Sequence, residues 1–283
     1  MYKYHNLNPI SQVGLDEFTK DYAPVSTPET ADAILVRSAA MHEMEFAPDL
    51  KAGDINEVRR LIEKYEMPVL GYTPEHNAYP YNYMIGSEAQ RRDAIDYLKL
   101  SLEMAKEMGA EFVLTSPANG GYLATYDQLW SRLEKNIQEL GDYAAKLEIK
   151  LVVEALTPYE SNFFTRANDL VELFRRVDNP YVVGMCDIVP PFVQHESIMA
   201  YFDKLGNKMD HMHIIDGENG SDTHLIPGEG NIPIKEMLYE MKRIGYDKTA
   251  TLELVTNYIN EPRFYAKRAI DNMRELMAEA GIV

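Results

Sequence analysis

Cysteine is nearly absent from this sequence of 283 residues, because Cys186 is the only one. A single thiol excludes an internal disulfide and any zinc or iron-sulfur site built from several cysteines. Long apolar runs are also missing, and none approaches the roughly 18 to 20 residues of a membrane span. The first residues, MYKYHNLNPI, lack the charged and then apolar layout of a signal peptide. We therefore expect a cytoplasmic protein with no membrane partner.

Basic residues are scarce relative to acidic ones. Lys and Arg together number 28 and Asp and Glu 45, which gives a formal net charge of −17. Such a charge argues against a nucleic-acid partner or an anionic membrane surface. It favours a small-molecule partner. The hydrophobic content of 46% is ample for a sizeable core.

A dinucleotide-binding fingerprint is lacking as well. No G-x-G-x-x-G follows a strand, and IPGEGNI (226–232) opens no convincing dinucleotide fold. We therefore expect no nucleotide cofactor. Because no Pro/Gly-rich linker, repeat or low-complexity tract marks a boundary, residues 1–283 are predicted to form a single domain.

From about residue 54 onward, amphipathic helices alternate with short runs rich in Val, Ile and Leu, a pattern typical of an α/β fold with a parallel sheet. The helix over 87–109 has the clearest ends, because Ser87 and Gln90 suit a capping box and Gly109 a helix terminus. Six strands are predicted, over 68–73, 112–117, 151–156, 181–188, 210–216 and 250–255. The other helices are predicted near 54–65, 126–148, 166–177, 197–206, 233–245 and 261–280.

The six predicted strand-helix units are two short of the eight that make a (β/α)8 TIM barrel, whose usual length is about 250 residues. Residues 1–46 offer these two strands in YKYHNLN and ADAILVRSA, with GLDEFTKDY as a helix between them. We therefore expect an α/β chain folded as a closed barrel, with an atypical N-terminal βαβ segment over 1–46. An open, doubly wound sheet is the competing architecture.

Four of the predicted strands carry an ionisable residue near their carboxyl ends: Glu154, Asp187, His213 and Glu253, which are 33, 26 and 40 residues apart. Each gap is one strand-loop-helix unit, so a barrel would raise all four side chains at the end where barrel active sites lie. A buried glutamate in VVEAL needs a partner, and a shared divalent cation would provide one. Alternatively, each residue is satisfied by a neighbouring loop.

Three carboxylates and one imidazole form an oxygen-rich ligand set. Such a set favours Mn²⁺ or Mg²⁺, and the imidazole also admits Co²⁺ or Ni²⁺. His211 and His213 face the same way in a strand, and only one need be a ligand. We favour His213 and interpret His211 as a supporting or core histidine. Cys186 and Trp130 are interpreted as core residues.

The loops that follow the strands over 68–73 and 112–117 could line the pocket. Tyr72, Asn77 and Ser116 are therefore candidate substrate-binding residues, together with Glu75, His76 and Asn119 as further pocket residues. His224, in SDTHLIPGEG, is a candidate partner for substrate or for Glu253. For each of them, ordinary loop packing is the alternative.

At these residues the sequence resembles the xylose-isomerase-like sugar isomerases and epimerases, and within them the ketose 3-epimerases of the fructoselysine type. The likeness is carried by FAPDLKAG (46–53), MPVLGYTPEHNAYPYN (67–82), LTPYESN (156–162), YFDKLGNKMDHMHIIDG (201–217), SDTHLIPGEG (221–230) and ELVTNYINEPRFYA (253–266). It covers about residues 46–283.

The resemblance implies that Glu154, Asp187, His213 and Glu253 bind the metal and that the two glutamates are also the catalytic acid/base pair. It implies that Glu160 contacts substrate hydroxyls. Simpler ketohexose epimerases have an Arg at the position of Asn219 and a His at that of Pro190. Both departures agree better with a ketosamine such as fructoselysine, interconverted with psicoselysine, than with a free ketohexose. Related barrels often associate, so a homo-oligomer is also expected.

Residues 1–46 instead resemble the N-terminal βαβ piece of the D-3-phosphoglycerate dehydrogenases, as in ADAILVRSAAMHEMEF (31–46). The chain is therefore interpreted as a fusion near Phe46. Two alternatives to a ketose 3-epimerase follow. One is another sugar isomerase, epimerase or dehydratase on the same barrel. The other is a chimera that binds the metal and has lost the reaction.

Overall fold

The chain divides into two units, Met1–Met67 and Pro68–Val283, and each is described by itself. The computed structural model describes residues 1–6, 15–16, 18–27, 30–35, 55–77, 81–218 and 220–282. The predicted fusion point near Phe46 and the residue Asn219 lie outside these ranges.

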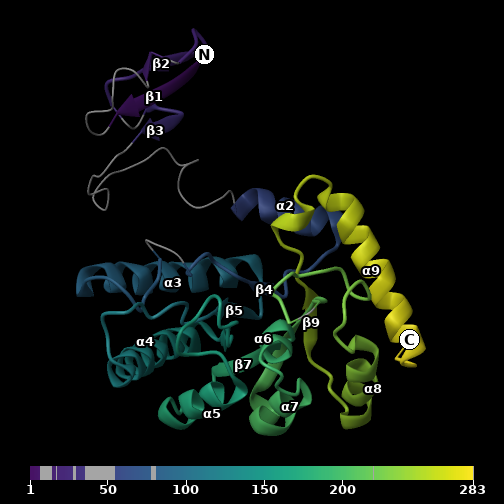
Figure 1. The fold of residues 1–283 in the computed structure, drawn as a ribbon. Coiled ribbons are helices and arrows are strands. Elements are labelled where there is room, and N and C mark those ends of the chain that lie inside the picture. The colour runs from purple at the N-terminus through teal and green to yellow at the C-terminus, as the bar shows by residue number, and fades with distance from the viewer. Residues whose placement is uncertain are drawn as a thin grey trace. The chain divides into compact units, whose positions relative to one another are not determined.

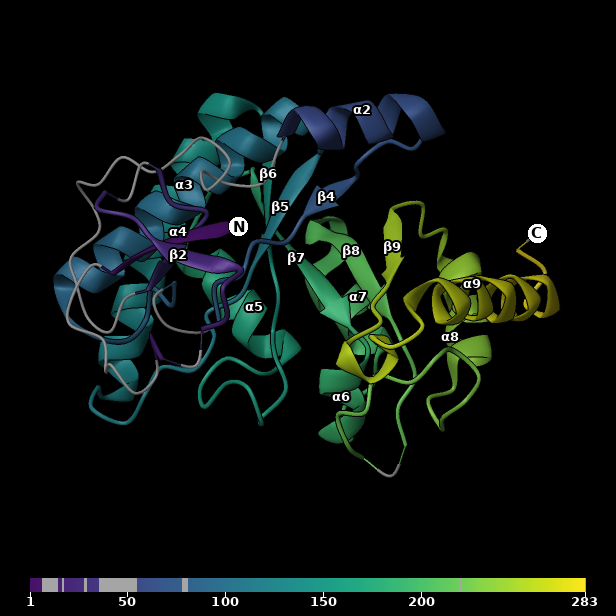
Figure 2. The same ribbon diagram turned by 90° about the horizontal axis from the view of Figure 1, so that it is seen from above.

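The second unit is built on six parallel strands that pair in chain order, β4-β5-β6-β7-β8-β9. This sequential order is that of a barrel wall, and Figure 2 shows the strands side by side with helices beside them. All six strands were predicted from the sequence. They are β4 (Gly71–Tyr72), β5 (Phe112–Thr115), β6 (Lys150–Val153), β7 (Val182–Asp187), β8 (Met209–Ile214) and β9 (Thr249–Leu252).

Helices connect successive strands, as Figure 1 shows. They are α3 (Glu88–Met108), α4 (Tyr126–Leu147), α5 (Ala167–Arg176), α6 (Val189–Val193), α7 (Met199–Leu205), α8 (Ile234–Ile244) and α9 (Pro262–Glu279), with short 3-10 helices at Gly206–Lys208 and Thr256–Tyr258. The predicted capping box at Ser87 and Gln90 is present, and Gly109 ends α3 with a left-handed φ of 79°. The short helix α6 was not predicted; Pro190 and Pro191 stand in its first turn, where proline is tolerated.

The sheet has two differently packed faces. Val113, Leu151 and Cys186 belong to the large core shared with the helices. Residues of the opposite parity, such as Leu114 and Met185, form a second cluster on the other face together with Phe112, Val152 and Val183. This alternation follows from the two-residue period of a strand, and it decides which side chains lie inside the incomplete barrel.

The first unit contains a three-stranded parallel sheet in the order β2-β1-β3, with β1 (Tyr2–Asn6), β2 (Tyr22–Pro24) and β3 (Ala33–Leu35), followed by helix α2 (Ile55–Tyr65). The first strand therefore lies in the middle, whereas a barrel wall keeps its strands in chain order. That residues 1–46 complete the barrel of a single domain over 1–283 stays a prediction.

The helix predicted over 14–22 is only partly described, and its end differs from the prediction. The backbone N–H of Tyr22 donates to the carbonyl of Thr19 at 3.1 Å, and Tyr22 begins β2. The Thr19 hydroxyl also accepts from the backbone N–H of Asp21 at 3.4 Å. Thr and Asp side chains compete with helix formation in this way and favour turns.

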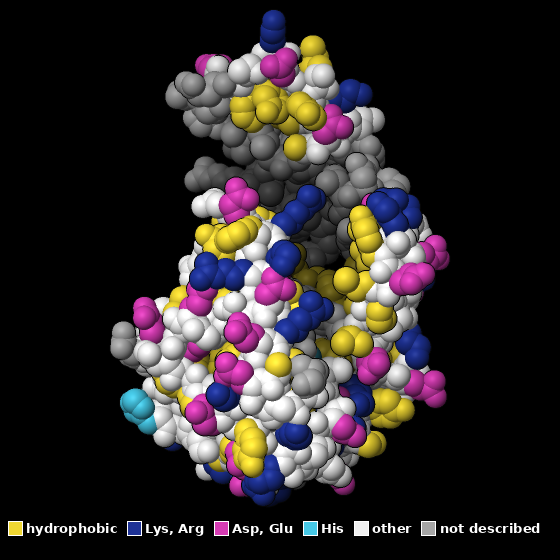
Figure 3. All heavy atoms as spheres, turned by 90° about the vertical axis from the view of Figure 1, so that its right-hand side faces the viewer, with side chains coloured by type: hydrophobic (Ala, Val, Ile, Leu, Met, Phe, Trp, Pro, Cys, Tyr) yellow, Lys and Arg dark blue, Asp and Glu magenta, His cyan; other side chains and the backbone are white. Residues whose placement is uncertain are grey.

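Charged side chains of both signs are interspersed on the face drawn in Figure 3. Among the described residues, many charged side chains form ion pairs within one helix, such as Arg175 with Glu172 at 2.7 Å. In the described part of the chain, no helix combines the length and the apolar character needed to cross a membrane.

Candidate metal and catalytic site

Four neighbouring strands deliver the predicted ligands to the inner face of the sheet. Asp187 ends β7 and has the parity of Met185, while Glu154 follows β6 with the parity of Val152. His213 pairs in register with Asp187 on one side and with Thr251 on the other. Glu253 is two residues beyond Thr251, so it faces the same way.

His213 lies at the centre of this group. Its Nδ1 is 3.1 Å from Oε2 of Glu253, 3.4 Å from Oε1 of Glu154 and 3.9 Å from Oδ2 of Asp187. Glu154, Asp187 and His213 are buried, with 7%, 5% and 6% of their surface exposed, and the Glu253 side chain is 34% exposed. The structure thus brings together the four residues that the sequence singled out.

Burial and mutual repulsion dominate the electrostatics of the group. Burial raises the pKa of Asp187 well above its ordinary value, and the negative charges of Glu253 and Glu154 raise it further. For His213, burial opposes the charged form, but the nearby carboxylates of Glu154 and Glu253 outweigh it and raise the pKa well above the ordinary value. Burial also disfavours the Glu253 anion, yet His213 holds the pKa of Glu253 at about 2. The imidazole of His213 therefore lies among three carboxylates.

These residues fit a divalent cation. Glu154, Asp187 and His213 each offer a ligand atom within 4.8 Å of the others, and so do Asp187, His224 and Glu253. Although it lies among carboxylates, Nδ1 of His213 is buried without a well-directed hydrogen bond. Within the described ranges, these carboxylates form ion pairs with histidines and not with Lys or Arg. Three crowded carboxylates and an orphaned imidazole nitrogen are the donor set that a cation would satisfy.

His224 joins the group from the loop between β8 and α8. Its Nδ1 is 3.7 Å from Oε2 of Glu253, and its Nε2 is 2.8 Å from Oδ1 of Asp222. Burial would lower the pKa of His224, but Asp222, Asp187 and Glu253 together raise it to about 9. The predicted proximity of His224 to Glu253 is therefore observed.

Glu160 lies on the loop after β6. Its Oε2 accepts from the backbone N–H of Thr157 at 3.1 Å and from the Thr157 hydroxyl at 2.8 Å. That hydroxyl is also 3.2 Å from Oδ2 of Asp222. Two carboxylates therefore flank Thr157 next to His224. Sequence reasoning missed Asp222 and Thr157, although Asp222 stands only two residues before His224 in SDTHLIPGEG.

A second polar network joins the ends of β4 and β5. The Nε2 of His76 accepts from the backbone N–H of Ser116 at 2.7 Å, so its Nδ1 carries the proton and donates to the Pro74 carbonyl at 2.6 Å. The Ser116 hydroxyl donates to Oδ1 of Asn77 at 2.7 Å, and the carbonyl of Asn119 accepts from Asn82 at 3.1 Å. Asn77 and Ser116 are thus linked to each other through this network.

Tyr72 lies elsewhere. It pairs in register with Val113 and packs against the core shared with the helices, so it is on the face opposite to the metal group. The substrate role predicted for Tyr72 gains no support from this placement, and those of Glu160, His224, Asn77 and Ser116 stay predictions.

His211, Trp130 and Cys186, interpreted from the sequence as core residues, are buried in the structure. The Nδ1 of His211 is 2.7 Å from the Thr249 hydroxyl and its Nε2 is 3.0 Å from the Thr251 hydroxyl. Desolvation lowers the pKa of His211 to about 4, so this ring is neutral. Trp130 and Cys186 are both buried, and Cys186 faces away from the side of Asp187.

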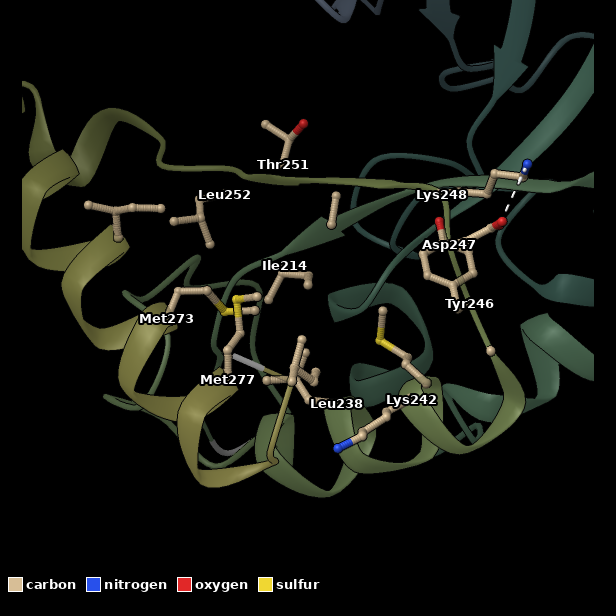
Figure 4. Close-up of a pocket in the computed structure, with 15 residues that line it drawn as sticks. Ile214, Leu238, Lys242, Tyr246, Asp247, Lys248, Thr251, Leu252, Met273 and Met277 are labelled. Atoms are coloured by element: carbon tan, nitrogen blue, oxygen red, sulfur yellow. Dashed lines mark ion pairs between the residues drawn. The ribbon is translucent and has the colours of Figure 1, made fainter.

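A pocket of about 630 Å³ lies away from this chemistry, between β8, β9, α8 and α9. Figure 4 shows Ile214, Leu238, Met273 and Met277 pointing into it, with Lys242 and Lys248 farther out. Its lining is mostly apolar and contains none of the metal-group residues, so we place the chemistry at the carboxylate group and not here. The pocket runs along β9, which is the last strand of the six-stranded sheet.

Comparison with known proteins agrees with this architecture. The family described as "Xylose isomerase-like TIM barrel" matches residues 32–276, so the chain belongs to this family and its fold class is the predicted TIM barrel. The chain is 48% identical over 234 residues to "Fructoselysine 3-epimerase" of Shigella flexneri, covering 83% of this chain and 85% of that protein. The same identity and coverage hold for "Fructoselysine 3-epimerase" of Escherichia coli O157:H7.

Among solved structures, the fold resembles "Structure of L-ribulose 3-epimerase" with a TM-score of 0.70 at 14% identity, covering 89% of this chain and 86% of that one. This likeness concerns the fold alone. The 48% identity to the two fructoselysine 3-epimerases confirms the resemblance that the sequence motifs indicated.

Proposed function

We propose that the chain is a carbohydrate epimerase of the isomerase class that inverts carbon 3 of a ketose or ketosamine with the help of a divalent metal ion. The observation that carries the proposal is the convergence of Glu154 and Glu253 on Nδ1 of His213, at 3.4 and 3.1 Å. The two glutamates follow β6 and β9, which are separated by two strands in the sheet. They therefore approach the centre from opposite sides.

Two carboxylates on opposite sides of a carbon atom suit an inversion by proton transfer. One glutamate removes the proton from carbon 3 on one face, which leaves that carbon planar. The other glutamate delivers a proton to the opposite face. Positioned acid/base groups of this kind contribute about 10²- to 10⁴-fold in rate.

Glu154, Asp187, His213 and Glu253 would hold the metal ion, as Mn²⁺, Co²⁺, Ni²⁺ or Mg²⁺. When bound, such an ion supplies Lewis-acid polarisation of the substrate oxygens, which makes the neighbouring carbon more acidic. The protein's own part is to bring the carboxylates close together in a buried place and to keep Asp187 oriented. Oδ1 of Asp187 accepts from the backbone N–H of Val189 at 2.7 Å, which leaves Oδ2 directed to His213.

Fructoselysine, in exchange with psicoselysine, is the substrate we propose. The 48% identity to proteins named fructoselysine 3-epimerase supports it. The acidic side chains of Glu160 and Asp222 flank Thr157 beside His224, and negative charge suits the cationic amine of this ketosamine. Pro190 lies buried in the first turn of α6, where simpler ketohexose epimerases carry a histidine.

The experiment is to incubate the protein with Mn²⁺ and fructoselysine and to identify the product by NMR. We expect psicoselysine, the carbon-3 epimer, and a higher kcat/KM for fructoselysine than for fructose. An aldose product would indicate an aldose-ketose isomerase, and loss of water a dehydratase. Bound metal without turnover of any ketose would mean a chimera that has lost the reaction.

A further inference from the structure

The loop between β8 and α8 carries His224 into the site, and it is built around one buried carboxylate. Asp216 is 1% exposed. Its Oδ1 accepts from the backbone N–H groups of Gly217 and Ile232, and its Oδ2 from those of Gly228 and Gly230, all at 2.9 Å. A carboxylate has about four lone-pair positions, so Asp216 uses its full capacity on the backbone of its own loop.

The glycines of the loop are matched to this carboxylate. A Cβ at Gly230 would lie 2.5 Å from Oδ1 of Asp216 and 2.4 Å from the carbonyl oxygen of Gly217, so no other residue fits without displacing them. Gly228 has a φ of +88°, which L side chains rarely adopt. The motif IPGEGNI is thus explained by the backbone geometry around Asp216 and not by phosphate binding.

The same loop is fixed next to His224. The backbone N–H and carbonyl of Asp216 pair with the carbonyl and N–H of Leu225 at 2.7 and 2.6 Å, directly after His224. His224 has a positive φ of 46°, a strained conformation that the surroundings must maintain. The loop is also tied to the segment that follows Glu253, because the Ile226 N–H donates to the Tyr258 hydroxyl at 3.1 Å.

We propose that Asp216 is a positioning residue: it holds the loop so that His224 stays beside Glu253 and Asp222. This inference rests on the proposed function, because it assigns His224 a part in the epimerisation. The four lone-pair positions of the Asp216 carboxylate are taken by four backbone donors of its own loop. It acts through the loop.

The test compares Asp216→Asn with Gly230→Ala. In Asp216→Asn, the amide places an N–H donor against two backbone N–H groups. In Gly230→Ala, the added Cβ would collide with the Asp216 carboxylate. We expect each variant to lower kcat about 10²-fold, as a misplacement of roughly 1 Å does. We expect the Mn²⁺ affinity to stay as in the wild type, because all four ligands lie at strand ends. Asp169→Asn, which alters another carboxylate that caps backbone N–H groups, should keep wild-type kcat.

A double-mutant cycle with His224→Ala separates positioning from general stability. If Asp216 acts through His224, Asp216→Asn combined with His224→Ala should lose no more kcat than His224→Ala alone. Hydrogen exchange should show faster exchange of the loop amides over 217–232 in both loop variants, with the remaining sheet unchanged.

Additive losses, a fall in Mn²⁺ affinity equal to the fall in kcat, or wild-type kcat in Asp216→Asn would each overturn the proposal. So would unfolding of both loop variants, since Asp216 would then be structural. If the wild type does not turn over fructoselysine, the proposed function fails by itself. The loop claim is then decided by hydrogen exchange, and unchanged protection over 217–232 in both variants would overturn it.

Discussion

The carboxylate nearest to His213 is that of Glu253, which follows the neighbouring strand, with Nδ1 and Oε2 3.1 Å apart. This contact is an ion pair when His213 is protonated. A metal ligand must present a free lone pair, so the proton on His213 and a metal ion compete for the same nitrogen.

Metal binding is therefore predicted to release a proton. The raised pKa of His213 means that the imidazole is still protonated at neutral pH in the metal-free protein. We expect release of about one proton per ion and an affinity for Mn²⁺ that rises with pH until the pH exceeds the raised pKa of His213. Calorimetry in buffers of different ionisation enthalpy measures this release. Heats that do not depend on the buffer would contradict it.

The His213→Ala variant supplies the control for that titration. It should lose more than the roughly 10- to 100-fold in affinity that an outer-shell partner typically contributes. His195→Asn should bind the metal as the wild type does, because His195 lies outside the group and its φ of 55° is one that Asn tolerates.

Stability at neutral pH is predicted to depend on Glu139, which joins α3 to α4. Its carboxylate accepts from Arg92 at 2.8 Å and from Lys99 at 2.6 Å, and mainly the Arg92 hydrogen bond lowers the pKa of Glu139 to about 2. A lowered folded-state pKa adds stability above the unfolded value of about 4.5, and this stability is lost as the pH falls toward 2.

Glu139→Gln should therefore lower the free energy of unfolding by about 1 kcal/mol at pH 7, the upper end for exposed pairs. The difference from the wild type should shrink between pH 4.5 and 2. Urea titrations over this pH range measure it. Glu134→Gln, which breaks the single 3.3 Å pair to Arg176, is the matched control and should cost less. A constant difference at every pH would refute the role of the charge.

Gly71 is predicted to be essential for the packing inside the incomplete barrel. A Cβ at Gly71 would lie 2.1 Å from the Phe112 ring, whose centroid is 4.7 Å from that of His211. Gly71→Ala should therefore destabilise the protein by about 1 to 3 kcal/mol, as overpacking does. Adding Phe112→Leu should recover part of this loss in thermal unfolding. An Ala variant as stable as the wild type would show that the ring moves freely.

The fold was largely predictable because its signals are local. Ser87, Gln90 and Gly109 fixed α3 through hydrogen bonds within a few residues, and the apolar runs fixed the six strands. The convergence of Glu154, Asp187, His213 and Glu253 was predictable because the period of a strand and the length of one strand-helix unit determine their position. Neither the two-residue period of a strand nor the length of a strand-helix unit depends on how the loops fold.

Loop residues were predictable only in part, because their positions depend on contacts distant in the chain. Asp222 reaches Thr157 across 65 residues, and Asp216 gathers donors up to 16 residues away. Tyr72 is a predicted pocket residue at the end of a strand, yet its parity turns it toward the helices. The order β2-β1-β3 could not be foreseen either, since β2 begins at the last residue of the predicted helix, where no strand was expected.

The central claim is that Glu154 and Glu253 act on opposite faces of carbon 3. Its most direct test is the uptake of deuterium from heavy water at carbon 3 of fructoselysine by the Mn²⁺-loaded wild type, Glu154→Gln and Glu253→Gln. We predict uptake with epimerisation in the wild type and no epimer from either variant, with uptake reduced by at least about 10²-fold. Wild-type uptake and epimerisation in both metal-loaded variants would contradict the account.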